Sequence, residues 1–136
     1  MSLENVEIVD RAHKAWQRDA LEGWLSLIDS DVEWLTAVER GIGGVTSVYR
    51  GHEGMRDLWN LWRTEVEDFW IETEDVRDLG GDRVLHLAEI QFRGTASGVV
   101  VKSQLALVQT LREGKIVRSE DYLSHQDALK AVGLED

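Results

Sequence analysis

The second half of this 136-residue chain is predicted to form four long β-strands joined by short turns. This succession of strands is the sequence feature that most limits the folds the chain can adopt. Alternation of polar and apolar residues predicts these strands over about 69–78, 83–93, 99–111 and 115–123. Glycines mark the turns between them, at Gly80–Gly81, Gly98 and Gly114. Strands that follow one another through such short turns pair antiparallel, so we expect a meander.

Helical periodicity dominates the first half of the chain. Apolar residues recur at helical spacing over about 3–17 and 53–66, and Asp19 to Glu22 resembles a capping box that would start a helix ending near Ile28. A strand is expected over 30–38, and the glycine-rich stretch 39–51 is expected to be a loop. Helices that precede a curved antiparallel sheet predict a single α+β domain over 1–136, a cone-shaped barrel with a hollow between helices and sheet.

The end of the chain carries its own helix signal. Ser124 and Asp127 resemble a capping box, and Gly133 is placed to end the short helix that would follow them.

Charge and composition exclude several classes of function. The net charge of −11, from 15 basic and 26 acidic residues, repels phosphate backbones, so we expect no nucleic-acid partner. The chain has no Cys, and no two His residues lie at helical ligand spacing, so we expect no metal site. No phosphate-binding motif is present, and we expect no cofactor. No apolar run approaches the ~20 residues of a membrane span, and the acidic start lacks a signal-peptide core, so a cytoplasmic protein without a membrane partner is expected.

The last hairpin decides which carboxylate faces the hollow. "LREGKI" matches a three-residue turn with Gly114 in the left-handed conformation, which would place Leu107 opposite Ser119 and Leu105 opposite Asp121. Opposed residues share a face, so the mostly apolar face with Gln109, Ser119 and Asp121 would point inward, and the face with Ile116 and Glu120 outward. A two-residue turn would reverse this assignment.

Asp121 and His86 are the candidate catalytic residues. His86 lies on the more apolar face of its strand, with Ala88 beside it, and would also face the hollow. A carboxylate in an apolar hollow is suited to acid–base chemistry, and a neutral imidazole could assist it. The structural alternative is a buried Asp that is satisfied by hydrogen bonds and ties the strand to the helices.

Candidate ligand-binding residues surround this pair. They are Trp16, Trp34, Trp59, Trp62, His13, Gln109 and Ser119. The Trp residues could form an aromatic wall for a flat, polycyclic or hydrophobic ligand, or they could be ordinary core residues. Trp24 and Trp70 are assigned to packing or to an interface.

Three segments of the chain resemble the SnoaL-like group of the nuclear transport factor two-like superfamily. They are "ENVEIVDRAHKAWQRDALEGWLSLIDSDVEW", "YRGHEGMRDLWNLW" and "LREGKIVRSEDYLSH". In SnoaL-like polyketide cyclases an Asp on the last strand is the catalytic acid/base, and Asp121 resembles it. The partner His of those enzymes falls at Leu107 here. The base and the oxyanion-hole acid of ketosteroid isomerases fall at Trp34 and Leu107, so that activity is not implied. The inward Arg that epoxide hydrolases of this fold need is not found either.

Two functions remain open from the sequence. The first is a cofactor-independent acid/base enzyme, of the polyketide cyclase or isomerase type, that acts on a hydrophobic carbonyl-containing small molecule. The second is a non-catalytic small-molecule-binding or protein-interaction module. A homodimer through the outer sheet face is expected, because Leu85, Leu87, Val108 and Ile116 are assigned to that face.

Overall fold

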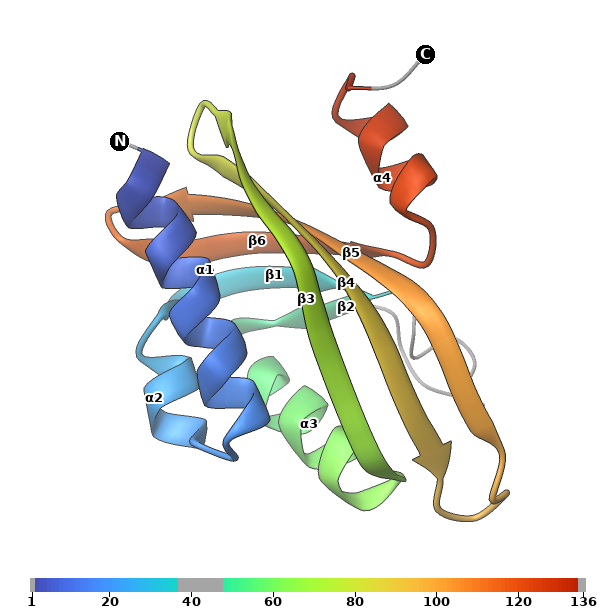
Figure 1. Cartoon of the computed structure of the whole chain (residues 1–136). Coiled ribbons are helices and arrows are strands. Elements are labelled where there is room, and N and C mark those ends of the chain that lie inside the picture. Colours follow the sequence, from blue (N-terminus) through green and yellow to red (C-terminus); the bar gives the residue numbers. More distant parts are fainter. Residues whose placement is uncertain (1, 37–47, 135–136) are drawn as a thin grey trace.

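The computed structural model describes residues 2–36 and 48–134, in which helices pack against a strongly curved sheet (Figure 1). In chain order the elements are α1 (Ser2–Gln17), α2 (Leu21–Leu25), β1 (Ile28–Leu35), β2 (Val48–Arg50), α3 (Gly51–Thr64), β3 (Val66–Gly80), β4 (Arg83–Gly94), β5 (Val100–Arg112), β6 (Lys115–Tyr122) and α4 (His125–Ala131). The α+β class and the meander of β3 to β6 are confirmed.

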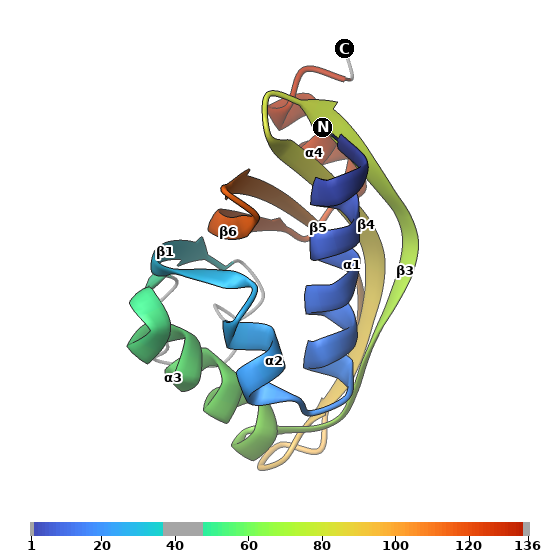
Figure 2. The ribbon, with the colours of Figure 1, turned by 90° about the vertical axis from the view of Figure 1, so that its left-hand side faces the viewer.

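The strands form one mixed sheet in the order β2-β1-β6-β5-β4-β3. β1 pairs parallel with β6, and the other neighbours pair antiparallel. Among the described residues β2 and β3 are the edge strands, so the sheet curls without closing into a barrel. Figure 2 shows β3 and β4 bending around α1, while α3 lies next to β1. The concave face of this sheet and the helices enclose the main core.

Two local predictions in the first half of the chain are wrong. The α2 helix begins after Ala20, which makes no side-chain cap, and it ends at Leu25 instead of near Ile28. Asp19 has a positive φ of 60° and binds Arg63 through its carboxylate, so it cannot cap the helix. Within the predicted loop 39–51, residues 48–50 form β2 and Gly51 starts α3, whereas 39–47 lie outside the described residues.

The β5–β6 hairpin differs from the prediction in its turn. Glu113 and Gly114 form a two-residue turn with φ values of 52° and 78°, and Arg112 pairs with Lys115. This turn alone would put Leu107 opposite Glu120. A second change of register lies between Thr110 and Leu111, where a β-bulge adds one residue to β6.

Together the turn and the bulge move the register by two residues. Leu107 therefore lies opposite Asp121, and Gln109 lies opposite Ser119. Since side chains alternate between faces with a period of two, the predicted inward face is preserved although the predicted pairs are wrong. Ile116 is an exception: it lies on the turn side of the bulge, pairs with Leu111 and is buried in the main core, not on the outer face.

A second, smaller core lies on the outer face of the sheet, beneath α4. Its buried members are Leu85, Leu87, Ala106, Val108 and Ala128. The helix is capped as predicted, because the Ser124 side chain accepts a hydrogen bond from the Asp127 amide. All four residues that motivated a homodimer are thus buried within the chain, three of them in this smaller core and Ile116 in the main core. The dimer itself stays a prediction.

Candidate active site

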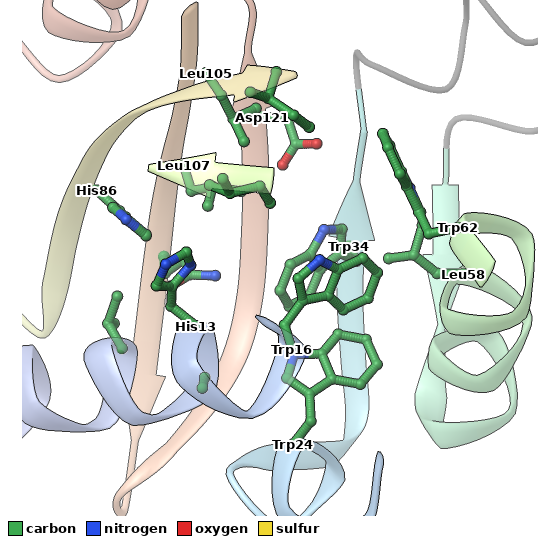
Figure 3. A pocket seen from close by; sticks show the side chains of 15 residues that line it. His13, Trp16, Trp24, Trp34, Leu58, Trp62, His86, Leu105, Leu107 and Asp121 are labelled. Carbon is green, nitrogen blue, oxygen red and sulfur yellow. The ribbon is translucent and has the colours of Figure 1, made fainter. Parts of the chain in front are cut away.

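A cavity of about 80 Å³ lies between the concave face of the sheet and the helices. Its lining residues come from α1, α2, α3 and five strands, and Figure 3 shows their side chains. They are Val9, Ala12, His13, Trp16, Trp24, Trp34, Leu58, Trp62, Ile71, His86, Ile90, Leu105, Leu107, Gln109 and Asp121. No Lys or Arg is among these described lining residues, and Asp121 supplies the one carboxyl group among them.

Indole rings form one wall of the cavity. Trp16, Trp34 and Trp62 line it as predicted, and so does Trp24, which had been assigned to packing. The ring centroids of Trp16 and Trp24 are 5.0 Å apart, and those of Trp24 and Trp34 are 5.9 Å apart. Trp59 is buried behind this wall and does not line the cavity, in contrast to the prediction. The rings thus pack against one another along this side of the cavity.

An Arg side chain stacks on the back of this aromatic wall. The guanidinium carbon of Arg63 lies 3.5 Å from the centroid of the Trp59 ring and 4.5 Å from that of Trp16. Arg63 also donates hydrogen bonds to the Asp19 carboxylate and to the backbone carbonyl of Trp16. Burial lowers the pKa of Arg63, and Asp19 opposes that shift. Arg63 therefore ties the end of α1 to α3 and fixes the position of the Trp16 ring.

His86 and His13 lie together at the opposite side of the cavity. Their ring centroids are 5.1 Å apart and the rings are nearly perpendicular. His86 is buried, with 1% of its surface exposed, and its Nε2 is 2.8 Å from the Thr73 hydroxyl oxygen. The sequence indicated an inward His86, and this is confirmed.

Both imidazoles are neutral at pH 7. The pKa of His86 is lowered to about 4, mainly by burial and also by the neighbouring His13, while Asp10 opposes the shift. Burial also lowers the pKa of His13, which Asp10 raises and Lys14 lowers. Each ring can therefore act as a hydrogen-bond donor, a hydrogen-bond acceptor or a base, but the imidazolium form is unfavourable in this environment.

Asp121 lies across the cavity from His86 and not in contact with it. His86 pairs with Leu107 across β4 and β5, and Leu107 pairs with Asp121 across β5 and β6. The two groups are thus two strand spacings apart, or roughly 10 Å. In Figure 3 Leu107 lies between them, and the Asp121 carboxylate points toward the Trp rings. The two residues can act on opposite ends of a bound molecule but cannot exchange a proton directly.

The polar floor of the cavity contains Gln109 and Ser119, both buried. The Gln109 side-chain amide donates to the Ser119 hydroxyl at 3.2 Å. Gln109 lines the cavity, whereas Ser119 lies behind it and would position the amide instead of contacting a ligand.

Two further His residues serve the fold. His52 Nε2 is 2.7 Å from the Ile28 carbonyl, which joins the start of α3 to β1. His125 Nε2 is 2.7 Å from the Ala88 carbonyl, so this side chain anchors α4 to β4 instead of facing solvent. Within residues 2–36 and 48–134, no group of three or more His, Cys, Asp or Glu side chains could hold a metal ion. No helix in this part of the chain is long and apolar enough to cross a membrane.

Like Trp24, Thr73 belongs to this site although the sequence did not indicate it. It is exposed, lies on the edge strand β3 and carries an ordinary hydroxyl. Its contact with His86 depends on the β3–β4 register, in which Thr73 pairs with Ala88, and strand periodicity alone does not reveal that register.

Solved structures similar to this one share the same fold. An NTF2-like protein of unknown function from Burkholderia pseudomallei has a TM-score of 0.79 and 19% identity, over 98% of this chain and 99% of that one. TerC, co-crystallised with polyporic acid, has a TM-score of 0.77 and 22% identity, over 95% and 98% of the two chains. A putative SnoaL-like polyketide cyclase from Jannaschia sp. has a TM-score of 0.75 and 15% identity, over 100% and 96%.

A comparison with curated proteins found no match. The model of the SnoaL-like domain matches residues 9–119, which is most of the chain and includes His86 and the Trp wall, whereas Asp121 lies two residues beyond the match. The chain therefore belongs to the SnoaL-like domain family, as the three sequence segments indicated.

Proposed function

We propose that this protein is a cofactor-independent acid/base enzyme, of the cyclase or isomerase type, that acts on a hydrophobic carbonyl-containing small molecule. The observation that carries the proposal is that a carboxylate and two neutral imidazoles share one apolar, Trp-lined cavity. Asp121 would remove or deliver a proton on one side of the substrate. His86 would assist on the other side, and the Trp wall would hold the apolar part.

The size of the cavity limits the substrate. Its volume of about 80 Å³ is well below the ~300–1,000 Å³ of pockets for drug-sized ligands. A compact substrate fits this volume, whereas a polycyclic one requires Trp side chains to rotate. We therefore favour small cyclic ketones and enones as first candidates, with larger ring systems tested beside them.

Two adjacent carboxylates provide a matched test of catalysis. Asp121→Asn should reduce turnover at least ~100-fold, the usual contribution of a positioned acid or base. Glu120→Gln is the control, because Glu120 lies on the other face of β6 next to Arg118. Turnover would be followed by absorbance for a panel of small enones, terpenoids, steroids and anthraquinone-like compounds. Undiminished turnover in Asp121→Asn would remove this residue from the mechanism.

A non-catalytic binding module is the second candidate. It is favoured by Leu107 and Trp34, which occupy positions where related enzymes carry catalytic groups, and by the separation of His86 from Asp121. Saturable quenching of Trp fluorescence by a compound that is not consumed would support it. Consumption of the same compound that depends on Asp121 would exclude it.

We also propose a homodimer and a cytoplasmic location. Trp70, which is 58% exposed on β3, and Val100, which is 50% exposed on β5, are apolar residues that α4 leaves uncovered. Light scattering coupled to size exclusion should give twice the chain mass of 15.5 kDa at micromolar concentration. A monomer under these conditions would exclude the dimer.

A further inference from the structure

An exposed hydroxyl is hydrogen-bonded to the buried imidazole of the cavity. Thr73 is solvent-exposed on the edge strand β3, and its hydroxyl oxygen lies 2.8 Å from Nε2 of His86. The ring of His86 is almost completely buried and lines the cavity. Thr73 thus joins solvent on one side to a cavity-lining base on the other.

The pairing of β3 with β4 places Thr73 beside this ring. Thr73 pairs with Ala88, Asp75 pairs with Leu87, and Val76 pairs with His86, so Glu74 is the additional residue. In a regular strand, residues three apart would lie on opposite faces. Because Thr73 pairs with Ala88, which is two residues from His86, it shares the inward face with His86 and lies diagonally next to it. The bulge then places Val76, and not Asp75, opposite His86 on that same face. Bulges commonly re-aim side chains in this way beside active sites.

The hydrogen bond uses one nitrogen of the ring and leaves the other for the ligand. Among the described residues, the hydrogen bond to Thr73 is the one that His86 makes, and it engages Nε2. Nδ1 is then the nitrogen available to a molecule in the cavity. A Thr hydroxyl can donate to Nε2 or accept from it, so it is compatible with both tautomers of the neutral ring.

We propose that Thr73 is a positioning residue that carries protons between solvent and His86. A proton arriving at Nδ1 from the ligand would be matched by a proton leaving Nε2 for the Thr73 hydroxyl, which passes its own proton to water. One proton crosses from the cavity to solvent, and the ring ends as the other neutral tautomer. The ligand side of this exchange rests on the proposed function, whereas the Thr73–His86 link does not.

The surroundings of the ring favour such an exchange over simple protonation. His13 faces His86 from α1 and disfavours a positive charge, and Asp10, also on α1, compensates only in part. Because burial makes the imidazolium costly, a proton that enters at one nitrogen needs an exit at the other. Thr73 supplies that exit at the edge of the sheet.

The test uses proton NMR and nitrogen NMR of the ligand-free protein labelled with ¹⁵N at its His residues. Ring-nitrogen shifts report the tautomer of His86, and the width of the Nε2–H signal reports its exchange with water. Thr73→Val removes the hydroxyl and keeps the shape, Thr73→Ser restores it, and His86→Gln assigns the signals. Thr110→Val is the matched control, because this Thr pairs with Arg118 outside the cavity.

Thr73→Val should change the tautomer population of His86 and slow the exchange of its ring N–H at least roughly tenfold, as expected when a donor–acceptor partner is lost. Thr73→Ser and Thr110→Val should resemble the unmodified protein. Unchanged shifts and exchange in Thr73→Val would overturn the proposal, and so would equal changes in Thr110→Val. Either result would leave the Asp121→Asn turnover test of the proposed function unaffected.

Discussion

Replacing Arg63 by Met should destabilise the protein far more than the same change at Arg56, about two turns earlier in the same helix. Arg63 has a side chain that is only 18% exposed, and it contacts the Asp19 carboxylate, the Trp16 carbonyl and the Trp59 ring. Met retains the apolar length of the side chain but removes the charge and every donor. The Trp16 carbonyl would then lose its charged partner in a partly buried location.

The expected loss follows from these contacts. A hydrogen bond from a charged group contributes about 1.5–3 kcal/mol, and the stacking of the guanidinium on an indole contributes about 0.5–2 kcal/mol. The ion pair with Asp19 adds little, since that carboxylate is 74% exposed. With the apolar contact of Met subtracted, we expect a loss of ~3 kcal/mol in the free energy of unfolding. For a chain of this length that loss lowers the melting temperature by roughly 10 °C.

Urea denaturation followed by circular dichroism measures this difference. Arg56→Met is the control, because the ion pair between Arg56 and Glu22 is exposed at both ends and should contribute less than about 0.5 kcal/mol. Trp fluorescence should change in Arg63→Met only, as Arg63 contacts the Trp16 and Trp59 rings. The reasoning is refuted if the two variants unfold within about 1 kcal/mol of each other.

Three further outcomes can be checked by stability measurements. The pKa of His86 is lowered to about 4 from 6.5, so between these pH values the unfolded chain binds a proton more readily than the folded protein. Between pH 7 and pH 4 the free energy of unfolding should therefore fall by ~3 kcal/mol more in the unmodified protein than in His86→Leu. Parallel stability curves for the two proteins would contradict this. Ser124→Ala removes the cap of α4 and should cost ~1 kcal/mol, visible as roughly fivefold faster amide exchange confined to that helix. Gly114→Ala should cost ~1 kcal/mol through its φ of 78° alone, because the added Cβ would meet only Ile8 at 3.9 Å; a larger loss would indicate a displaced hairpin.

Most helices and strands were predictable from the sequence because each has a local signal. The apolar stripe of α3 and the alternation in β4 depend on neighbouring residues only, and the Ser124 cap lies within four residues of its partner. The start of α2 was not predictable in this way. Asp19 has the chemistry of a cap, but Arg63, which is 44 residues away, binds its carboxylate instead. Asp19 instead adopts a left-handed backbone conformation, with φ of 60°, in which its carboxylate meets Arg63 and not the helix start, and no local pattern contains this contact.

The candidate site also has features that the sequence predicted and features that it did not. Residue type and strand parity placed His86 and Asp121 on the concave face, and an even shift in the β5–β6 register left Asp121 there although its predicted neighbour was wrong. Parity is a local property, so the sequence determined which side chains face the hollow.

Distances between those side chains are set by how strands from different parts of the chain pair, so only the tertiary structure decided them. Register placed Leu107 between His86 and Asp121, and it also brought Thr73 next to His86. Packing of the Trp rings against one another reduced the hollow to about 80 Å³. Each of these outcomes depends on contacts between residues remote in sequence, whose energies no local pattern contains.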